Sequence, residues 1–282
     1  MAALSVLVVA IAAPGHATVR VVATIFPLAD VVRQVGREHV DVATLLPAGA
    51  SPHTFEPTPA QMRALAQARV CVRVGAGLDN WAEKLLAAHG GGLTVVTVTD
   101  GMELIGAVDG HGGDPHVWLD PVRVRDVAVP AIVAALSAAD PEARAAFEHA
   151  AAEFQAALTQ LDTDVRNALT PLTQREYIAF HSAWRYFGQR YGLHEIAVVE
   201  PFPGKEPSAY EVASIVDRAR AAHIHAVLIE PQFNPAVAQQ IAREFGGVAL
   251  VVDPIGGLNI PERNHYIDLM RYNARVFSEA LR

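Results

Sequence analysis

Three histidines and one aspartate stand where the chain could bind a metal ion: His53, His116, His181 and Asp253. Imidazole nitrogens and carboxylate oxygens are usual protein ligands of zinc. Proline adjoins His53, His116 and Asp253, and its ring restricts the neighbouring backbone. The four positions are too far apart in sequence for a compact zinc-finger pattern. Only the fold could assemble such a site.

Each of these residues also has an ordinary interpretation. A lone histidine in a loop is commonly a surface residue, and an aspartate before proline commonly forms a turn. The argument for metal binding is their shared position, since each follows the end of a β-branched or apolar run. In open parallel sheets, ligands collect at the carboxyl ends of the strands. The spacing alone supports both interpretations equally.

The elements that would carry these residues follow from the hydrophobic pattern. Short β-branched runs alternate with longer helical segments, which is typical of a parallel sheet flanked by helices. Two series of four strands are predicted, at residues 20–26, 41–46, 70–74 and 94–97, and at residues 176–180, 194–199, 226–230 and 248–252. We therefore expect an α/β fold of two similar lobes, each with a four-stranded, mostly parallel sheet.

A long helix is expected between the two series of strands. Asp140 suits the N-cap and Pro141 the first helical position. Phe147, Phe154 and Leu161 then recur every seven residues and predict one apolar stripe. We expect this helix to join the lobes as a rigid strut. A coiled-coil dimer is the alternative explanation of the stripe.

The chain is accordingly divided into a signal peptide at residues 1–17, an N-terminal lobe at 18–138, the linking helix at 139–170 and a C-terminal lobe at 171–282. The first segment has the apolar run and small residues of a secretory signal, although it lacks Lys or Arg at its start. It is too short to span a bilayer as a helix. No cysteine follows it, so we expect an exported, soluble protein without a lipid anchor.

The composition narrows the classes of partner. The chain has 282 residues, with 22 Lys and Arg against 30 Asp and Glu, and a formal net charge of −8. Nucleic-acid binding needs a basic face, so no nucleic-acid partner is expected. Cys71 is the one cysteine of the sequence, which excludes an intrachain disulfide and a cysteine-rich metal cluster.

Several segments, all in one order, resemble the zinc and manganese solute-binding proteins of ABC transporters. The first reads Ser-Pro-His-Thr-Phe-Glu-Pro-Thr-Pro and the second Asp-Pro-His-Val-Trp-Leu-Asp-Pro. The similarity extends from about Val21 to the C-terminus. The matching segments are residues 51–59, 114–121, 180–181 with 186–187, 204–208, 230–233 and 253–254.

The resemblance implies a ligand set and a metal. In that family the ion sits in a cleft between two α/β lobes joined by one long helix, and the positions that match its ligands are His53, His116, His181 and Asp253. Three imidazoles and one carboxylate suit zinc, whereas manganese prefers more oxygen. Manganese-binding relatives typically carry Glu where this chain has His181. The implied cargo is one Zn²⁺ per chain, with Mn²⁺ less favoured.

The resemblance also implies a role. It indicates a periplasmic, monomeric zinc-binding protein that captures Zn²⁺ and delivers it to the membrane permease of an ABC-type importer. A metallochaperone is a further candidate partner. No enzymatic activity is implied. Three alternatives stay open: a manganese carrier of the same family, a zinc-dependent hydrolase with Asp253 as general base, and an adhesin or metal-storage protein.

The loop before the second histidine departs from the family pattern. Zinc-specific relatives often have a long stretch rich in histidine and acidic residues at this point. The corresponding stretch here, residues 106–113, is short, and Asp109 and His111 are its only acidic or histidine side chains. An auxiliary metal contact by His111 and a plain spacer are the two interpretations.

Four further residues are candidates for supporting roles. Glu206 and Glu230 are candidates for orienting the imidazoles, since histidine ligands usually donate their second nitrogen to a carboxylate or carbonyl. Trp118 and Trp184 lie close in sequence to His116 and His181. They would either wall the metal site or simply pack in the core.

Overall fold

The computed structural model describes residues 18–89, 91–108, 112–201 and 204–282, without the side chains of Lys84 and Ala88. The expected signal peptide at residues 1–17, and with it the cleavage site, lies outside the described residues. So do Asp109 and His111. Among the described residues, none of the helices is both long and apolar enough to cross a membrane.

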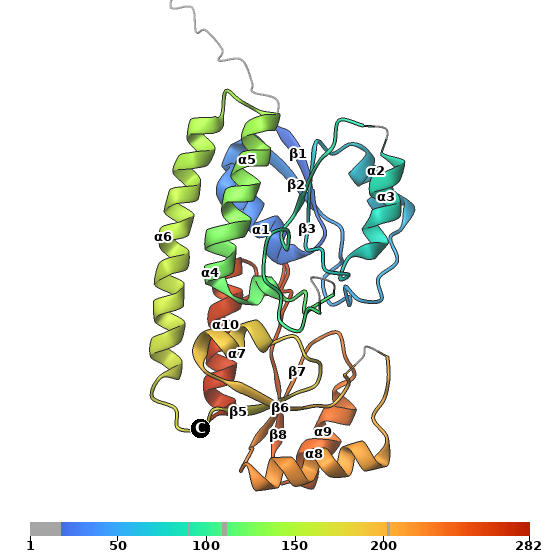
Figure 1. Cartoon of the computed structure of the whole chain (residues 1–282), viewed down its shortest axis with the longest axis vertical. Helices are drawn as coiled ribbons and strands as arrows, with labels where there is room; N and C mark the ends of the chain where they lie inside the picture. Colours follow the sequence, from blue (N-terminus) through green and yellow to red (C-terminus); the bar gives the residue numbers. More distant parts are fainter. Residues whose placement is uncertain (1–17, 90, 109–111, 202–203) are drawn as a thin grey trace, which may run out of the picture.

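Two four-stranded parallel sheets form the centres of the two lobes (Figure 1). The first has the order β2-β1-β3-β4 and the second β6-β5-β7-β8, so the two halves repeat one topology. The strands are β1 Val19–Ala23, β2 Val40–Thr44, β3 Val70–Arg73, β4 Thr94–Thr97, β5 Glu176–Ala179, β6 His194–Val198, β7 Ala226–Ile229 and β8 Val248–Val251. All eight expected strands are present, with bounds that differ by a few residues.

Helices cover the sheets and connect their strands, as parallel pairing requires. They are α1 Phe26–Gly36, α2 Pro59–Ala66, α3 Glu83–Ala88, α4 Pro121–Arg123, α5 Val129–Ala139, α6 Arg144–Leu169, α7 Arg185–Tyr191, α8 Ala209–Ala221, α9 Pro235–Glu244 and α10 Tyr266–Ala280. A π-helical segment, Val124–Ala128, joins α4 to α5 without a break.

The expected long helix is α6, which runs along both lobes (Figure 1). It begins at Arg144 and not at Pro141, because the Asp140 side chain accepts a hydrogen bond from the Ala143 backbone at 3.4 Å and closes a turn there. Its predicted apolar stripe is buried. The stripe packs inside the chain, because α6 lies against α1, α5 and α10. The coiled-coil alternative is therefore wrong.

The largest of three hydrophobic clusters in the described part of the chain extends through both lobes. It contains residues of the first sheet, such as Val72, and of the second, such as Tyr177 and Leu228. The C-terminal helix α10 contributes Tyr266 and packs against α6 and α1. Where one lobe ends and the next begins therefore stays a prediction.

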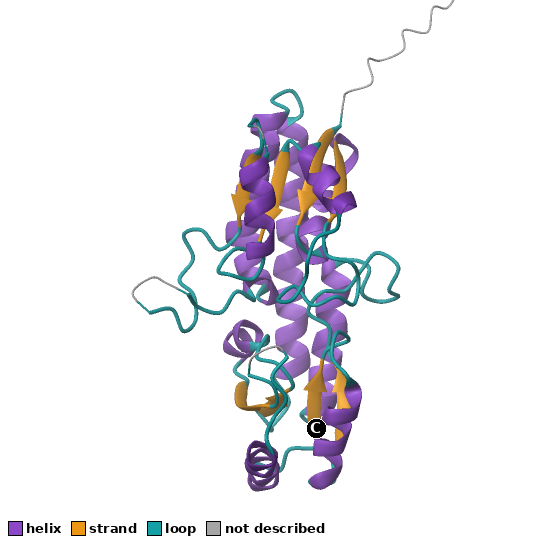
Figure 2. Cartoon of the chain, turned by 90° about the vertical axis from the view of Figure 1, so that its right-hand side faces the viewer, coloured by secondary structure: helices purple, strands orange, loops and turns teal. Residues whose placement is uncertain are grey.

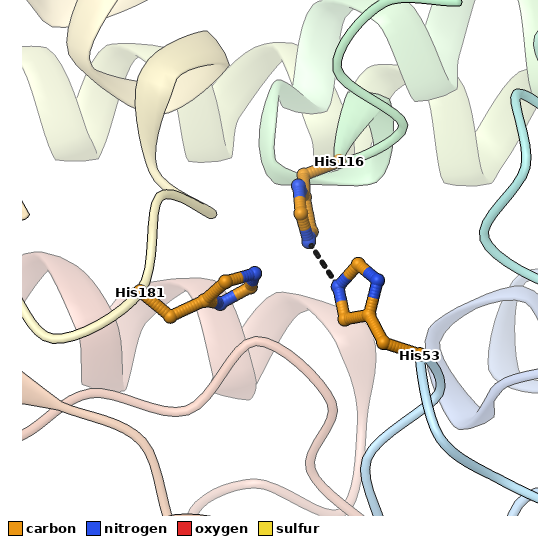
Figure 3. Close-up of side chains that lie close together, drawn as sticks. All are labelled: His53, His116 and His181. Carbon is orange, nitrogen blue, oxygen red and sulfur yellow. Dashed lines mark hydrogen bonds between the residues drawn. The ribbon is translucent and has the colours of Figure 1, made fainter. Parts of the chain in front are cut away.

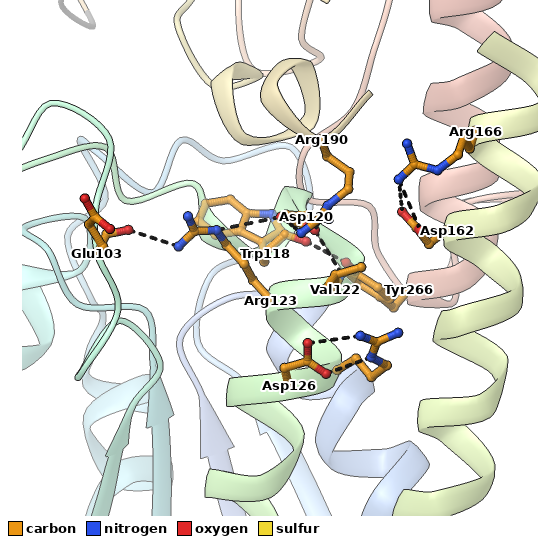
Figure 4. A network of polar contacts seen from close by, with 11 residues as sticks. Glu103, Trp118, Asp120, Val122, Arg123, Asp126, Asp162, Arg166, Arg190 and Tyr266 are labelled. Carbon is orange, nitrogen blue, oxygen red and sulfur yellow. Dashed lines mark hydrogen bonds and ion pairs between the residues drawn. The ribbon is translucent and has the colours of Figure 1, made fainter. Parts of the chain in front are cut away.

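Hydrogen bonds also join the lobes close to the expected site. The indole nitrogen of Trp118 donates to the Pro254 carbonyl at 2.7 Å. The Tyr266 hydroxyl donates to the Trp118 carbonyl at 2.6 Å (Figure 4). Buried polar groups need such partners, and these two fix the loop after β4 against the loop after β8.

The carboxyl ends of the two sheets point toward the middle of the molecule (Figure 2). Loops lie between the two sheets (Figure 2), and each expected ligand lies on the loop that follows β2, β4, β5 or β8. Parallel strands expose all their carboxyl ends at one edge, so two facing sheets bring loops from distant parts of the sequence together.

Candidate metal centre

Three imidazoles from the two lobes converge between the sheets (Figure 3). One potential ligand atom each of His53, His116 and His181 lies within 4.8 Å of the others. The ring centroids are 5.0 to 5.3 Å apart. His116 and His181 are buried, and His53 is partly buried. Among the described residues this is the only such group of three or more His, Cys, Asp or Glu side chains.

The spacing of two of these nitrogens fits a zinc ion. The Nε2 atoms of His53 and His116 are 3.3 Å apart. Ligands that surround zinc as a tetrahedron at about 2.0 Å are separated from one another by about 3.3 Å. The pair can also share one proton as a hydrogen bond, with the donor set by the tautomer.

The His53 loop is fixed by its neighbours. The Trp81 indole nitrogen donates to the Pro52 carbonyl at 3.1 Å, and the Trp81 ring meets Phe55 edge to face at 4.8 Å between centroids. The His53 backbone nitrogen donates to the Ser51 hydroxyl at 3.3 Å. These contacts hold a loop of little regular structure in one place and so position the backbone of His53.

His116 is oriented by Asp114. The Asp114 carboxylate lies 2.7 Å from His116 Nδ1 and also accepts the His116 backbone N–H at 3.0 Å. The Tyr186 hydroxyl of α7 donates to the Asp114 carbonyl at 2.8 Å, which fixes this loop against the other lobe. A carboxylate on Nδ1 leaves Nε2 as the free lone pair for a metal.

His181 has a second buried carboxylate beside it. Glu230, at the end of β7, places Oε1 at 3.5 Å from His181 Nδ1. The same oxygen accepts a hydrogen bond from the Trp184 indole nitrogen at 3.2 Å. Glu230 therefore stands where an orienting residue is expected, while Glu206 is exposed.

Burial keeps two of the imidazoles neutral. It lowers the pKa of His53 to about 3, with further lowering by His116 and His181. Burial also lowers the pKa of His116, against the opposing effect of the Asp114 carboxylate. A neutral imidazole offers a metal its lone pair without first losing a proton.

Asp253 lies outside the three-histidine group, and both of its carboxylate oxygens already accept hydrogen bonds. Its Oδ1 accepts the backbone N–H groups of Ile255 and Gly256, both at 2.9 Å. Its Oδ2 accepts from the Arg263 guanidinium at 3.0 Å. The carboxylate that was expected as fourth ligand is thus paired with a cation in this structure.

The two tryptophans belong to the core and border the site at once. Trp118 and Trp184 are 1% and 0% exposed. The Trp118 ring lies 5.3 Å from the His116 ring, and Trp184 reaches the site through Glu230. The two interpretations offered for them are therefore compatible.

Sequence reasoning missed two residues next to the expected ligands. Asp114 could have been found, because an Asp two positions before a histidine can reach its ring within one turn. Arg263 left no such signal, since its contact with Asp253 depends on how the loop after β8 folds back.

Comparison with known proteins agrees with this geometry. The chain matches the family described as "Zinc-uptake complex component A periplasmic" over residues 21–280. The high-affinity zinc uptake system protein ZnuA of Bacillus subtilis (strain 168) is 27% identical over 278 residues, which cover 93% of this chain and 87% of that protein.

A second relative and a solved structure give the same picture. The zinc-binding protein AdcA of Streptococcus pyogenes serotype M3 is 29% identical over 283 residues, which are 90% of this chain and 54% of that protein. The chain thus spans about half of that relative. A crystal structure of ZnuA superimposes with a TM-score of 0.86 at 29% identity, over 94% of this chain and 100% of that one.

Proposed function

The chain belongs to the family of periplasmic zinc-uptake complex component A proteins, and on that premise we propose that it captures one Zn²⁺ per chain and delivers it to the permease of an ABC-type importer. The observation that carries the proposal is the convergence of His53, His116 and His181 from both lobes. The relatives named as zinc uptake and zinc-binding proteins support the same cargo.

The donor set supports zinc over manganese. The three converging side chains offer nitrogen only, which suits zinc, whereas manganese is bound best by sites rich in oxygen. Asp253, which the resemblance implies as a fourth ligand, would have to leave Arg263 before it could bind an ion. We further propose that a soluble monomer captures the ion in the periplasm, and a metallochaperone that loads the site is compatible with this role.

The contacts of Asp253 speak against a hydrolase. A zinc hydrolase keeps one coordination position for water and places a general base beside it. Asp253 was the candidate base, but its oxygens accept two backbone N–H groups and the Arg263 guanidinium. A carboxylate held in this way is a poor proton acceptor. A carrier needs binding and release alone.

A zinc titration tests the proposal. Competition with a chromophoric chelator should give tight binding of one zinc per wild-type chain, and weakening by about a hundredfold for His116→Ala. His149→Ala is the matched control, because the His149 side chain is 78% exposed on α6. Unchanged zinc affinity of His116→Ala, or an equal loss in His149→Ala, would refute the ligand assignment. Zinc-dependent ester or phosphate hydrolysis by the wild type would refute the carrier role.

A further inference from the structure

The loop after β8 places the Arg263 guanidinium against the Asp253 carboxylate. Arg263 donates through one Nη to the carboxylate at 3.0 Å, and its guanidinium stacks over the Tyr272 ring at 4.8 Å. The Arg263 backbone is fixed at both ends, since its N–H donates to the Ile260 carbonyl and its carbonyl accepts from Gly257, each at 3.1 Å. The guanidinium is thus positioned by stacking and by the turn.

The turn depends on a glycine beside the pair. Gly256 has a φ of +67°, and a Cβ at this position would lie 2.5 Å from the Arg263 carbonyl oxygen. Its N–H donates to Asp253 Oδ1. Gly256 therefore lets the backbone of Arg263 approach closely, and its own N–H binds the Asp253 carboxylate.

The Asp253 backbone is fixed as well. Asn273 of α10 accepts from the Asp253 N–H at 2.8 Å and donates to its carbonyl at 2.7 Å. The next residue, Pro254, accepts from Trp118, whose ring lies against the ligand histidine His116. Asp253 is thus connected through Pro254 and Trp118 to the loop of His116, and its side-chain oxygens accept from Ile255, Gly256 and Arg263.

We propose that Arg263 is a specificity-determining residue, which withholds the Asp253 carboxylate from an ion held by the three histidines and so favours zinc over manganese. This inference rests on the proposed function. Without an oxygen donor the site is nitrogen-only, and manganese loses more than zinc by that restriction. The ion pair also neutralises a charge that would otherwise attract any divalent cation.

Removal of the guanidinium tests this inference. Arg263→Met keeps a long side chain to cover Tyr272 and removes the charge; Arg263→Lys keeps the charge. Zinc and manganese affinities are measured by competition with a fluorescent indicator. In Arg263→Met, the ratio of zinc to manganese affinity should fall about tenfold, through a gain in manganese binding. Arg263→Lys should stay near the wild type.

Asp253→Asn completes the design. In the wild-type background it should change zinc affinity by less than about threefold, and combined with Arg263→Met it should abolish the gain in manganese binding. Thermal unfolding of each variant reports folding, and Arg263→Gln replaces Arg263→Met if the latter does not fold. A merely structural role of Arg263 predicts weaker binding of both metals, never a gain.

Two outcomes overturn the inference. One is an unchanged metal ratio in folded Arg263→Met or Arg263→Gln. The other is a loss of zinc affinity in Asp253→Asn as large as that in His116→Ala, which would make Asp253 a ligand in spite of Arg263. Failure of the proposed function looks different, because His116→Ala would then bind zinc like the wild type.

Discussion

Arg190 and Asp120 form a two-point ion pair between the lobes, with Nε to Oδ1 and Nη2 to Oδ2 both at 2.9 Å (Figure 4). Asp120 lies on the His116 loop and caps α4 through the Val122 N–H at 2.9 Å. Arg190 lies on α7, which follows the His181 loop. The pair therefore joins the two loops that carry the buried histidines, and fixes how the lobes meet.

Loss of this ion pair should destabilise the protein strongly. The Asp120 side chain is 6% exposed, so Arg190→Met would leave a buried carboxylate with Arg123 as its nearest cation at 3.7 Å. We expect the free energy of unfolding to fall by about 3 kcal/mol in urea titrations. Arg37→Met is the matched control, since its bond to Glu153 joins two side chains that are half exposed. It should cost less than about 1 kcal/mol. Equal losses of unfolding free energy in the two variants would show that the Arg190–Asp120 pair stabilises the protein no more than an exposed ion pair does.

Removal of the Asp114 charge should weaken zinc binding without unfolding the protein. Asp114→Asn keeps an acceptor near His116 Nδ1 but loses the negative charge that strengthens this imidazole as a donor. Zinc affinity should drop about tenfold in a competition titration. Asp126→Asn is the control, because the Asp126 side chain is 53% exposed on the π-helical segment. An unchanged affinity in Asp114→Asn would remove Asp114 from the site.

Acid should destabilise the metal-free protein through the buried imidazoles. The pKa of His53 is lowered to about 3 by burial, and burial lowers the pKa of His116. The unfolded chain takes up these protons near the ordinary pKa of about 6.5 and the folded chain does not. The unfolded state then binds more protons, so the free energy of unfolding falls as pH decreases below about 6.5, until His53 itself is protonated near pH 3.

The size of this effect can be isolated with one variant. Each such histidine contributes a slope of up to about 1.4 kcal/mol per pH unit. His53→Gln should show a shallower slope between about pH 6 and 4, while His149→Gln should keep the wild-type slope. Urea titrations across this range measure both. A His53→Gln slope equal to that of the wild type would mean that His53 is protonated in the folded protein.

Much of the fold could be predicted from the sequence, because local patterns determine it. The eight strands follow from β-branched runs, and α6 from the apolar stripe of Phe147, Phe154 and Leu161. The start of α6 was misplaced, because Asp140 closes a turn and does not cap the helix. The core shared by the lobes is a product of long-range packing, which residue patterns do not contain.

The candidate site shows the same division. Strand ends and the family resemblance were enough to select His53, His116 and His181, which the fold brings together. The state of Asp253 was beyond such reasoning, since it depends on a loop that returns Arg263 to the carboxylate. Sequence position relative to the strands is enough to predict candidate ligands. Contacts between loops decide which candidates are already paired with another side chain, as Asp253 is with Arg263.

The buried Glu230 carboxylate determines how a substitution of His181 changes the metal preference of the site. A glutamate in place of His181 would supply an oxygen donor for manganese, but Glu230 is 1% exposed and lies 3.5 Å from the present ring. Two buried carboxylates at this distance repel, and one of them takes up a proton. His181→Glu alone should therefore lose zinc affinity and gain little for manganese. Combined with Glu230→Gln, which removes the repulsion, it should bind manganese about tenfold more tightly than the single variant in a competition titration. Equal manganese affinity of the single and double variants would mean that Glu230 does not act on the residue at position 181.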